Sequence, residues 1–219
     1  MHSFYQFITG PLAWVAIGVF LVGSLYRLTD MLIRVNQKEK FIFSHMSLKY
    51  GLRSILHWIT PFATVNMRRH PILTIVTFAF HLCLLITPIF LLSHMVLWDE
   101  SWNINWWYLP DGVANIMSLI VIACCIYFLV RRLVSPEVKF VTSMSDYVIL
   151  GVVSAPFITG FLAYNQWFGY PFFAILHILS GEIMLVTIPF SRLSHMLFFP
   201  FTRAYMGSEF GAVRHARDW

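Results

Sequence analysis

Long apolar runs alternate with short polar segments along this chain, and the alternation predicts a set of membrane-spanning helices. Each of five runs is close to the roughly 20 residues that an α-helix needs to cross a bilayer. We expect these helices at residues 12–35, 71–97, 112–130, 147–164 and 171–199. A further stretch, residues 41–66, repeats its apolar residues on one helical stripe, for example at Leu52, Ile55, Leu56 and Ile59. This pattern predicts an amphipathic helix that lies in the membrane interface.

The composition supports a membrane protein rather than a soluble one. Hydrophobic residues make up 58% of the chain and charged residues 11%, and the mean hydropathy is +0.71, well outside the range of soluble domains. We therefore predict one all-α integral membrane domain that covers residues 1–219. Cys83, Cys124 and Cys125 all lie in apolar runs, which predicts buried thiols rather than disulfides. The first apolar run lacks a basic segment before it, so we do not expect a cleavable signal peptide.

The basic residues fall on one side of this five-span arrangement. All 15 Lys and Arg residues lie in the last turns of span one, between spans one and two, between spans three and four, or at the end of span five and after it. The opposite side carries Asp99, Glu100 and Asp111. By the positive-inside rule the N-terminus is outside and the C-terminus is cytoplasmic. We expect a multi-pass protein of the cytoplasmic (inner) membrane, whose basic character reflects topology and not nucleic-acid binding.

The fifth span carries two histidines, His177 and His195. They are eighteen residues apart, which is five helical turns, so an uninterrupted helix would present both on one face. Their separation would be about 27 Å, close to the ~30 Å thickness of the hydrocarbon core. Neutral imidazole is the commonest protein metal ligand and a ligand of haem iron. The span therefore offers one candidate haem ligand near each membrane surface.

The second span offers a matching pair, with two possible choices. His81 is deep in the apolar run and His94 is near its outer end, with Pro88 between them as an expected kink. His70, at the cytoplasmic boundary, is the alternative: its eleven-residue spacing from His81 is close to three turns, while thirteen residues separate His81 from His94. We favour His81 and His94, because the kink can rotate one ring and because His70 lies among surface charges.

Four histidines on two antiparallel spans, two near each surface, predict a pair of bis-histidine b haems. The axial ligands would be His81, His94, His177 and His195. The chain has no CxxC, CxxCH or HExxH motif, so c-type haem and zinc-protease sites are unsupported. Two alternatives stay open: a structural membrane anchor with one haem or none, and a transporter that depends on the histidines. No internal repeat favours the transporter.

Five further residues are candidates for contacts with haem propionates or a quinone: Arg192, Ser191, Glu182, Trp98 and Trp102. Glu182 lies within an apolar run, where a carboxyl group favours its neutral form and serves either quinol proton transfer or a structural hydrogen bond. Arg192 suits propionates or lipid headgroups. The tryptophans belong to an aromatic belt that would also flank the outer haem.

The ligand motifs resemble a known family. The Phe80-His81-Leu82 sequence, the spacing from His177 to His195 and the segment IPFSRLSHM are similar to the γ subunit of respiratory nitrate reductase. That family is a dihaem b quinol oxidase that anchors cytoplasmic iron–sulfur and catalytic subunits. The resemblance implies that His177 ligates the outer haem, and that His195 and His81 ligate the cytoplasmic one. It implies His94 as the second outer ligand if this helix has a few extra residues between its two histidines.

The C-terminal half is more similar to one branch of these cytochromes. The segments LVSPEVKFVT, FITGFLAY, HILSGE and FFPFTRAYMGSEFG resemble the membrane b subunit of the Tmc and Dsr transmembrane redox complexes of sulfate-reducing bacteria. This resemblance implies two haem b, menaquinone, a periplasmic multihaem cytochrome c and a cytoplasmic iron–sulfur subunit as cofactors and partners. It implies oxidoreductase activity only within a complex, because the chain has no domain for a soluble substrate.

Overall fold

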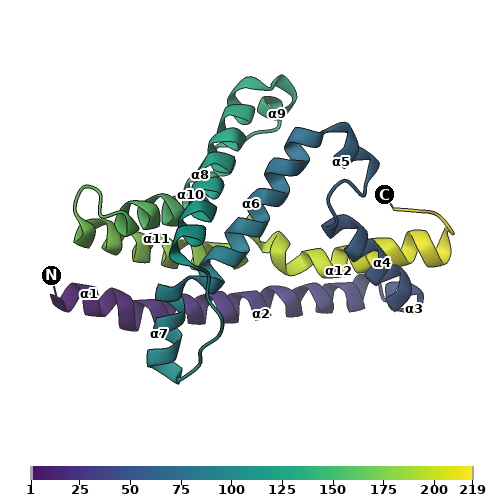
Figure 1. Cartoon of the computed structure of the whole chain (residues 1–219). Helices are drawn as coiled ribbons and strands as arrows, with labels where there is room; N and C mark the ends of the chain where they lie inside the picture. Colours follow the sequence, from purple (N-terminus) through teal and green to yellow (C-terminus); the bar gives the residue numbers. More distant parts are fainter. Residues whose placement is uncertain (1, 219) are drawn as a thin grey trace. The chain divides into compact units, whose positions relative to one another are not determined.

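The computed structural model describes residues 2–218, and every regular element among them is helical. Helices hold 84% of the chain, which confirms the all-α class. In chain order (Figure 1) they are α1 His2–Phe7, the π-helical turn η1 Ile8–Leu12, α2 Ala13–Lys38, α3 Ile42–His45, α4 Leu48–Ile59, α5 Val65–Arg69, α6 Pro71–Phe90, α7 Leu92–Trp102, α8 Asp111–Val134, α9 Pro136–Phe140, α10 Met144–Tyr164, α11 Tyr170–Phe190, the 3₁₀ turn η2 Arg192–Ser194, α12 His195–Ser208 and the π-helical turn η3 Glu209–Val213.

The number of long apolar helices agrees with the prediction from the sequence. Within residues 2–218, five helices are long and apolar enough to cross a membrane: Ser3–Lys38, Pro71–Phe90, Asp111–Val134, Met144–Tyr164 and Tyr170–Phe190. The first is longer than expected, because the helix continues through a π-helical turn around Pro11. Proline has no backbone N–H, and such a turn accommodates the lost hydrogen bond without ending the helix.

The chain folds as two compact units, which are described separately. The first contains Met1–Ala13 and Val76–Met184, and the second contains Trp14–Ile75 and Leu185–Trp219. In the first unit α8 and α10 pack along each other. The rings of Phe80 and Phe128 meet edge to face, with centroids 5.3 Å apart, so α6 also packs on α8. The three cysteines are buried in this unit and free, as expected from the sequence.

The second predicted span is broken rather than kinked, so the expected continuous helix over residues 71–97 was wrong. α6 ends at Phe90, and Leu91 has extended backbone angles (φ −74°, ψ 129°) before α7 begins. Pro88 lies in the last turn of α6, where its missing N–H weakens the helix. His94 consequently belongs to α7, and its direction is independent of the face that His81 occupies on α6.

The fifth predicted span is also interrupted, so the continuous helix over residues 171–199 was wrong. α11 contains Pro189 and ends at Phe190, and Ser191 is extended (φ −128°, ψ −173°). The Ser191 hydroxyl accepts a hydrogen bond from the backbone N–H of Leu193 (3.1 Å), which caps the following 3₁₀ turn. His195 begins the separate helix α12, so the two histidines do not share the face of one uninterrupted helix.

In the second unit, α4 and α12 lie side by side through small residues. A Cβ added at Gly51 would lie 3.2 Å from Ala204, and the backbone N–H of Ser47 donates to the Ser208 hydroxyl (3.0 Å). Such residues allow close approach of two helices. The large apolar side chains of α4 are exposed, with Leu48, Leu52, Leu56 and Ile59 each about half or more exposed. The amphipathic pattern predicted for residues 41–66 therefore has a small-residue face on α12 and an exposed apolar stripe.

This packing predicts a steric cost for a side chain at Gly207. A Cβ there would lie 2.5 Å from both the Ser54 Cβ and the Tyr50 carbonyl oxygen. We expect Gly207→Ala to lower the free energy of unfolding by about 1–3 kcal/mol, the usual cost of overpacking. Thermal unfolding followed by circular dichroism in detergent would measure the change. Gly18→Ala is the control, because no atom lies within 4 Å of its added Cβ. Equal stability of the two variants would contradict the close packing.

Candidate functional site

The structure brings together two of the histidines singled out from the sequence, His94 on α7 and His177 on α11. Their ring centroids are 5.8 Å apart, and the ring planes are nearly parallel, at 18° to each other. Both residues belong to the first compact unit. Both rings are only partly accessible. Two imidazoles from different helices therefore face one another within a mostly apolar unit.

Each of these rings is held by a backbone carbonyl. The Nδ1 atom of His94 lies 2.8 Å from the Pro88 carbonyl oxygen, and Nδ1 of His177 lies 2.8 Å from the Pro156 carbonyl oxygen. A carbonyl only accepts, so Nδ1 carries the proton in both rings and Nε2 keeps its lone pair. Neither Nε2 makes a hydrogen bond within residues 2–218. This is the tautomer of a metal-ligating histidine, whose second nitrogen is fixed by a carbonyl.

The broken end of α6 supplies the carbonyl for His94. The last carbonyls of a helix have no partner within it. Pro88 O accepts from His94 Nδ1 (2.8 Å), Ile89 O from Trp106 Nε1 (2.9 Å), and Phe90 O from the backbone N–H of Leu109 (2.8 Å). The interruption after Phe90 thus makes these acceptors available and aims the His94 ring.

A glycine makes room for the other ring. Gly160 lies on α10, one turn after Pro156, and a Cβ added there would be 2.8 Å from Nδ1 and 2.9 Å from Cε1 of His177. A real Cβ would collide with the ring. Gly160 therefore lies directly against the imidazole.

His81 and His195 show the same local arrangement as the facing pair. His81 Nδ1 lies 2.8 Å from the Thr77 carbonyl oxygen on its own helix, α6. His195, the first residue of α12, has its Nδ1 atom 2.9 Å from the carbonyl oxygen of Arg192 in the preceding turn η2. His81 belongs to the first unit and His195 to the second. The alternative candidate His70 is exposed and lies between α5 and α6.

The other candidate residues have varied surroundings. Glu182 is buried, 9% exposed, and its Oε1 atom has no hydrogen-bond partner in the described part of the chain. Ser191 caps a 3₁₀ turn, and Arg192 is exposed. The rings of Trp98 and Trp102 meet edge to face with centroids 5.9 Å apart. Glu182 is the least satisfied polar group among these candidates.

The facing histidines are only two, which is too few to hold a metal ion by side chains alone. Among residues 2–218 no three His, Cys, Asp or Glu side chains gather as a metal site would require. Haem iron takes four nitrogens from the porphyrin and needs only two ligands from the protein.

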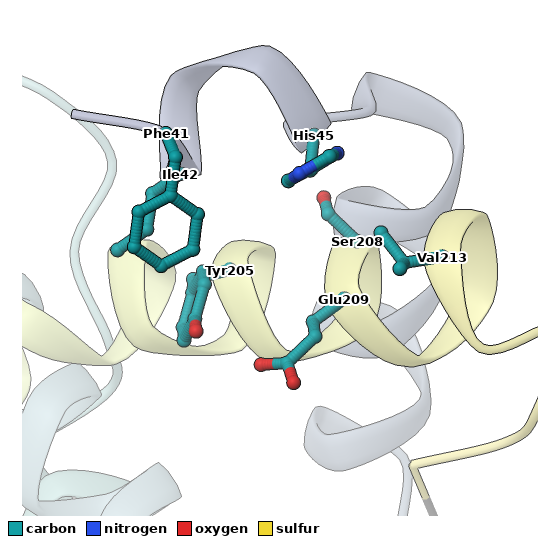
Figure 2. A pocket seen from close by; sticks show the side chains of 7 residues that line it. All are labelled: Phe41, Ile42, His45, Tyr205, Ser208, Glu209 and Val213. Atoms are coloured by element: carbon teal, nitrogen blue, oxygen red, sulfur yellow. The ribbon is translucent and has the colours of Figure 1, made fainter. Parts of the chain in front are cut away.

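A separate pocket of about 220 Å³ lies in the second unit (Figure 2). It is lined by Phe41, Ile42, His45, Tyr205, Ser208, Glu209 and Val213. The Tyr205 hydroxyl and the Arg214 guanidinium hydrogen-bond to Glu209, and these contacts hold the pKa of Glu209 below its ordinary value. Its carboxylate is thus already neutralised by its neighbours. The pocket contains none of the four predicted haem ligands.

The fold and the facing histidines define the class as a multi-pass α-helical membrane protein with a paired imidazole site. No protein-family model matches the chain. It is 33% identical over 214 residues to a chain of Nitratidesulfovibrio vulgaris strain Hildenborough that is described as "Protein", with 96% of this chain and 95% of the relative covered. At this identity and coverage, the chain belongs to the same family as that protein.

Proposed function

We propose that this chain is the dihaem b membrane subunit of a respiratory redox complex. It would move electrons across the membrane between menaquinone or a periplasmic cytochrome c and a cytoplasmic iron–sulfur subunit. The observation that carries the proposal is the His94–His177 pair, with ring centroids 5.8 Å apart and both Nδ1 atoms on backbone carbonyls. A structural histidine needs only one hydrogen-bond partner. Two neighbouring rings on separate helices, each with Nδ1 held by a backbone carbonyl, are typical of axial ligands.

For the second haem the proposal keeps His81 and His195, the ligands predicted from the sequence. Each also directs Nδ1 to a carbonyl oxygen, at 2.8 and 2.9 Å. All four histidines singled out from the sequence therefore place Nδ1 against a backbone carbonyl oxygen, and in the proposal Nε2 would be the nitrogen that binds iron. His57 is the contrast, because its Nε2 atom lies against the Ala63 carbonyl oxygen (3.0 Å).

The charge distribution supports the orientation of the proposed subunit. With the N-terminus outside, the basic residues face the cytoplasm, His94 and His177 lie near the outer surface, and His195 lies near the cytoplasmic one. The basic residues after α2, and those before, in and after α12, then face a soluble iron–sulfur partner. Asp99 and Glu100, in α7, face a basic partner or a quinol on the outer side.

Haem b, when bound, supplies one-electron transfer at the potential that its surroundings set. The protein's part is to hold each Nδ1 proton on a carbonyl, which fixes the ring orientation and makes Nε2 more basic. Glu182 is a buried carboxyl group without a hydrogen-bond partner within residues 2–218, and we propose it as the internal proton site of quinol oxidation. The exposed tryptophans of α7 anchor the outer end of the site in the interface.

The haem content of the purified complex tests this proposal. We expect two b haems per chain by pyridine haemochrome assay, with a reduced α-band typical of b-type cytochromes. A properly assembled sample without haem would contradict it and favour a structural anchor. Uptake of a solute into liposomes by a haem-free sample would instead favour a transporter.

A further inference from the structure

We infer that Trp106, in the segment between α7 and α8, is the residue that positions His94 as a ligand; this inference rests on the proposed function. Trp106 lies in a tryptophan-rich segment, close to Trp98 and Trp102 of the predicted aromatic belt. In the structure its indole N–H donates to the Ile89 carbonyl oxygen (2.9 Å), next to the carbonyl of Pro88 that holds His94.

Trp106 differs from the other tryptophans around it. Trp102 and Trp107 are 56% and 66% exposed, as expected for residues at a membrane interface, while Trp106 is only partly exposed. Aromatic residues at the interface usually direct their N–H toward water or headgroups. Trp106 donates its N–H to a helix end instead, so its role goes beyond anchoring in the bilayer.

The indole of Trp106 contacts both sides of the break that places His94. Its N–H reaches the end of α6. Its ring lies 6.3 Å from that of Trp98, which is one turn after His94 on α7. One rigid side chain therefore connects the helix that supplies the carbonyl with the helix that supplies the imidazole. The angle between α6 and α7 sets where the His94 ring points.

The rest of the segment holds Trp106 in place. Asn103 ends α7 in the left-handed conformation (φ 55°), which asparagine tolerates better than most residues. Asn105 donates to the Asp99 carboxylate on α7 (2.9 Å), and Leu109, buried, donates its backbone N–H to the Phe90 carbonyl oxygen (2.8 Å). The segment thus returns from the end of α7 to the end of α6 (Figure 1) and is fixed at both.

The test removes the indole N–H and leaves an aromatic ring. In Trp106→Phe the Ile89 carbonyl loses its donor, and the end of α6 is free to move. We expect one haem signal to shift in redox titration and in the low-spin ferric electron paramagnetic resonance spectrum, and it should be the signal that His94→Ala removes. The other haem should keep its potential and spectrum.

Trp107→Phe is the matched control. Trp107 is the next residue and its ring lies 5.7 Å from that of Phe90, a contact that phenylalanine can keep. Its N–H makes no hydrogen bond in the described part of the chain, so both haem signals should stay at their wild-type positions. Equal shifts in the two variants would mean that the ring, and not the N–H, matters, and would overturn the inference.

A second substitution covers the case in which Trp106→Phe does not assemble. Benzothienylalanine at position 106 keeps both fused rings and replaces the N–H with sulfur, so packing is retained. An unchanged haem signal in that protein would overturn the role of Trp106 while two haems per chain still support the proposed function. A wild-type complex without haem would contradict the proposed function itself.

Discussion

We expect His177→Ala to reduce the haem content from two b haems per chain to one, and His94→Ala to remove the same haem. The two rings face each other at 5.8 Å between centroids, so each variant deletes one side of a single site. His81→Ala and His195→Ala should remove the other haem and leave this one. Pyridine haemochrome assays combined with electron paramagnetic resonance of the ferric haems would give the count and show which signal is lost.

His70→Ala is the control that separates the two ligand choices open from the sequence. His70 is exposed at the end of α5, so its removal should leave both haem signals in place. Loss of a haem in His70→Ala, with both retained in His94→Ala, would show that the second helix uses His70 and would contradict the site proposed here. Unchanged spectra in His177→Ala would contradict a haem at this pair altogether.

The apolar helices could be predicted from the sequence because their signal is local. A helix that crosses a membrane needs about 20 apolar residues in succession, and each of the five runs meets that requirement on its own. The amphipathic helix α4 could be predicted equally well, because its apolar residues repeat at helical spacing within a few turns. The packing of its small-residue face could not be predicted, because the contact of Gly51 with Ala204 joins residues far apart in the chain.

The interruptions of the second and fifth spans were harder to predict. Proline predicts a weak point in a helix, but many apolar helices continue through it, as α10 does at Pro156. Whether the helix ends depends on what satisfies its freed carbonyl groups. After Pro88 the hydrogen-bond donors are Trp106 and Leu109, which belong to a segment beyond α7. Their contact with the end of α6 could not be predicted from the sequence.

The histidines themselves were identifiable by type and depth, while their supporting residues were not. A histidine within an apolar run is costly and indicates a function, which drew attention to His81 and His177. The acceptor for His177 is the backbone carbonyl of Pro156 on α10. Because every residue has a backbone carbonyl, the sequence does not distinguish this one. Only the fold identifies that one, and only the fold shows Gly160 against the imidazole.

Gly160→Ala should weaken the same haem as His177→Ala without removing any ligand. The added Cβ would lie 2.8 Å from Nδ1 and 2.9 Å from Cε1 of His177, and neither distance is tolerable. The ring would have to rotate away and stretch its hydrogen bond to the Pro156 carbonyl oxygen (2.8 Å). Overpacking of this kind costs about 1–3 kcal/mol, so we expect the haem affinity of this pair to fall by about 5- to 150-fold, with a shifted ferric spectrum for any haem that remains. Haem titration of the apoprotein would measure it.

Gly151→Ala on the same helix makes the comparison specific. No atom lies within 4 Å of a Cβ added at Gly151, and both substitutions raise helix propensity by a similar amount, roughly 0.5–1 kcal/mol. Any difference between the two variants therefore reports the contact with His177. Because the cost at Gly160 falls on the imidazole, the signal assigned to His81 and His195 should be unaffected in both proteins. If Gly160→Ala binds two haems with wild-type affinity and spectra, the His177 ring cannot occupy its present position in the loaded protein.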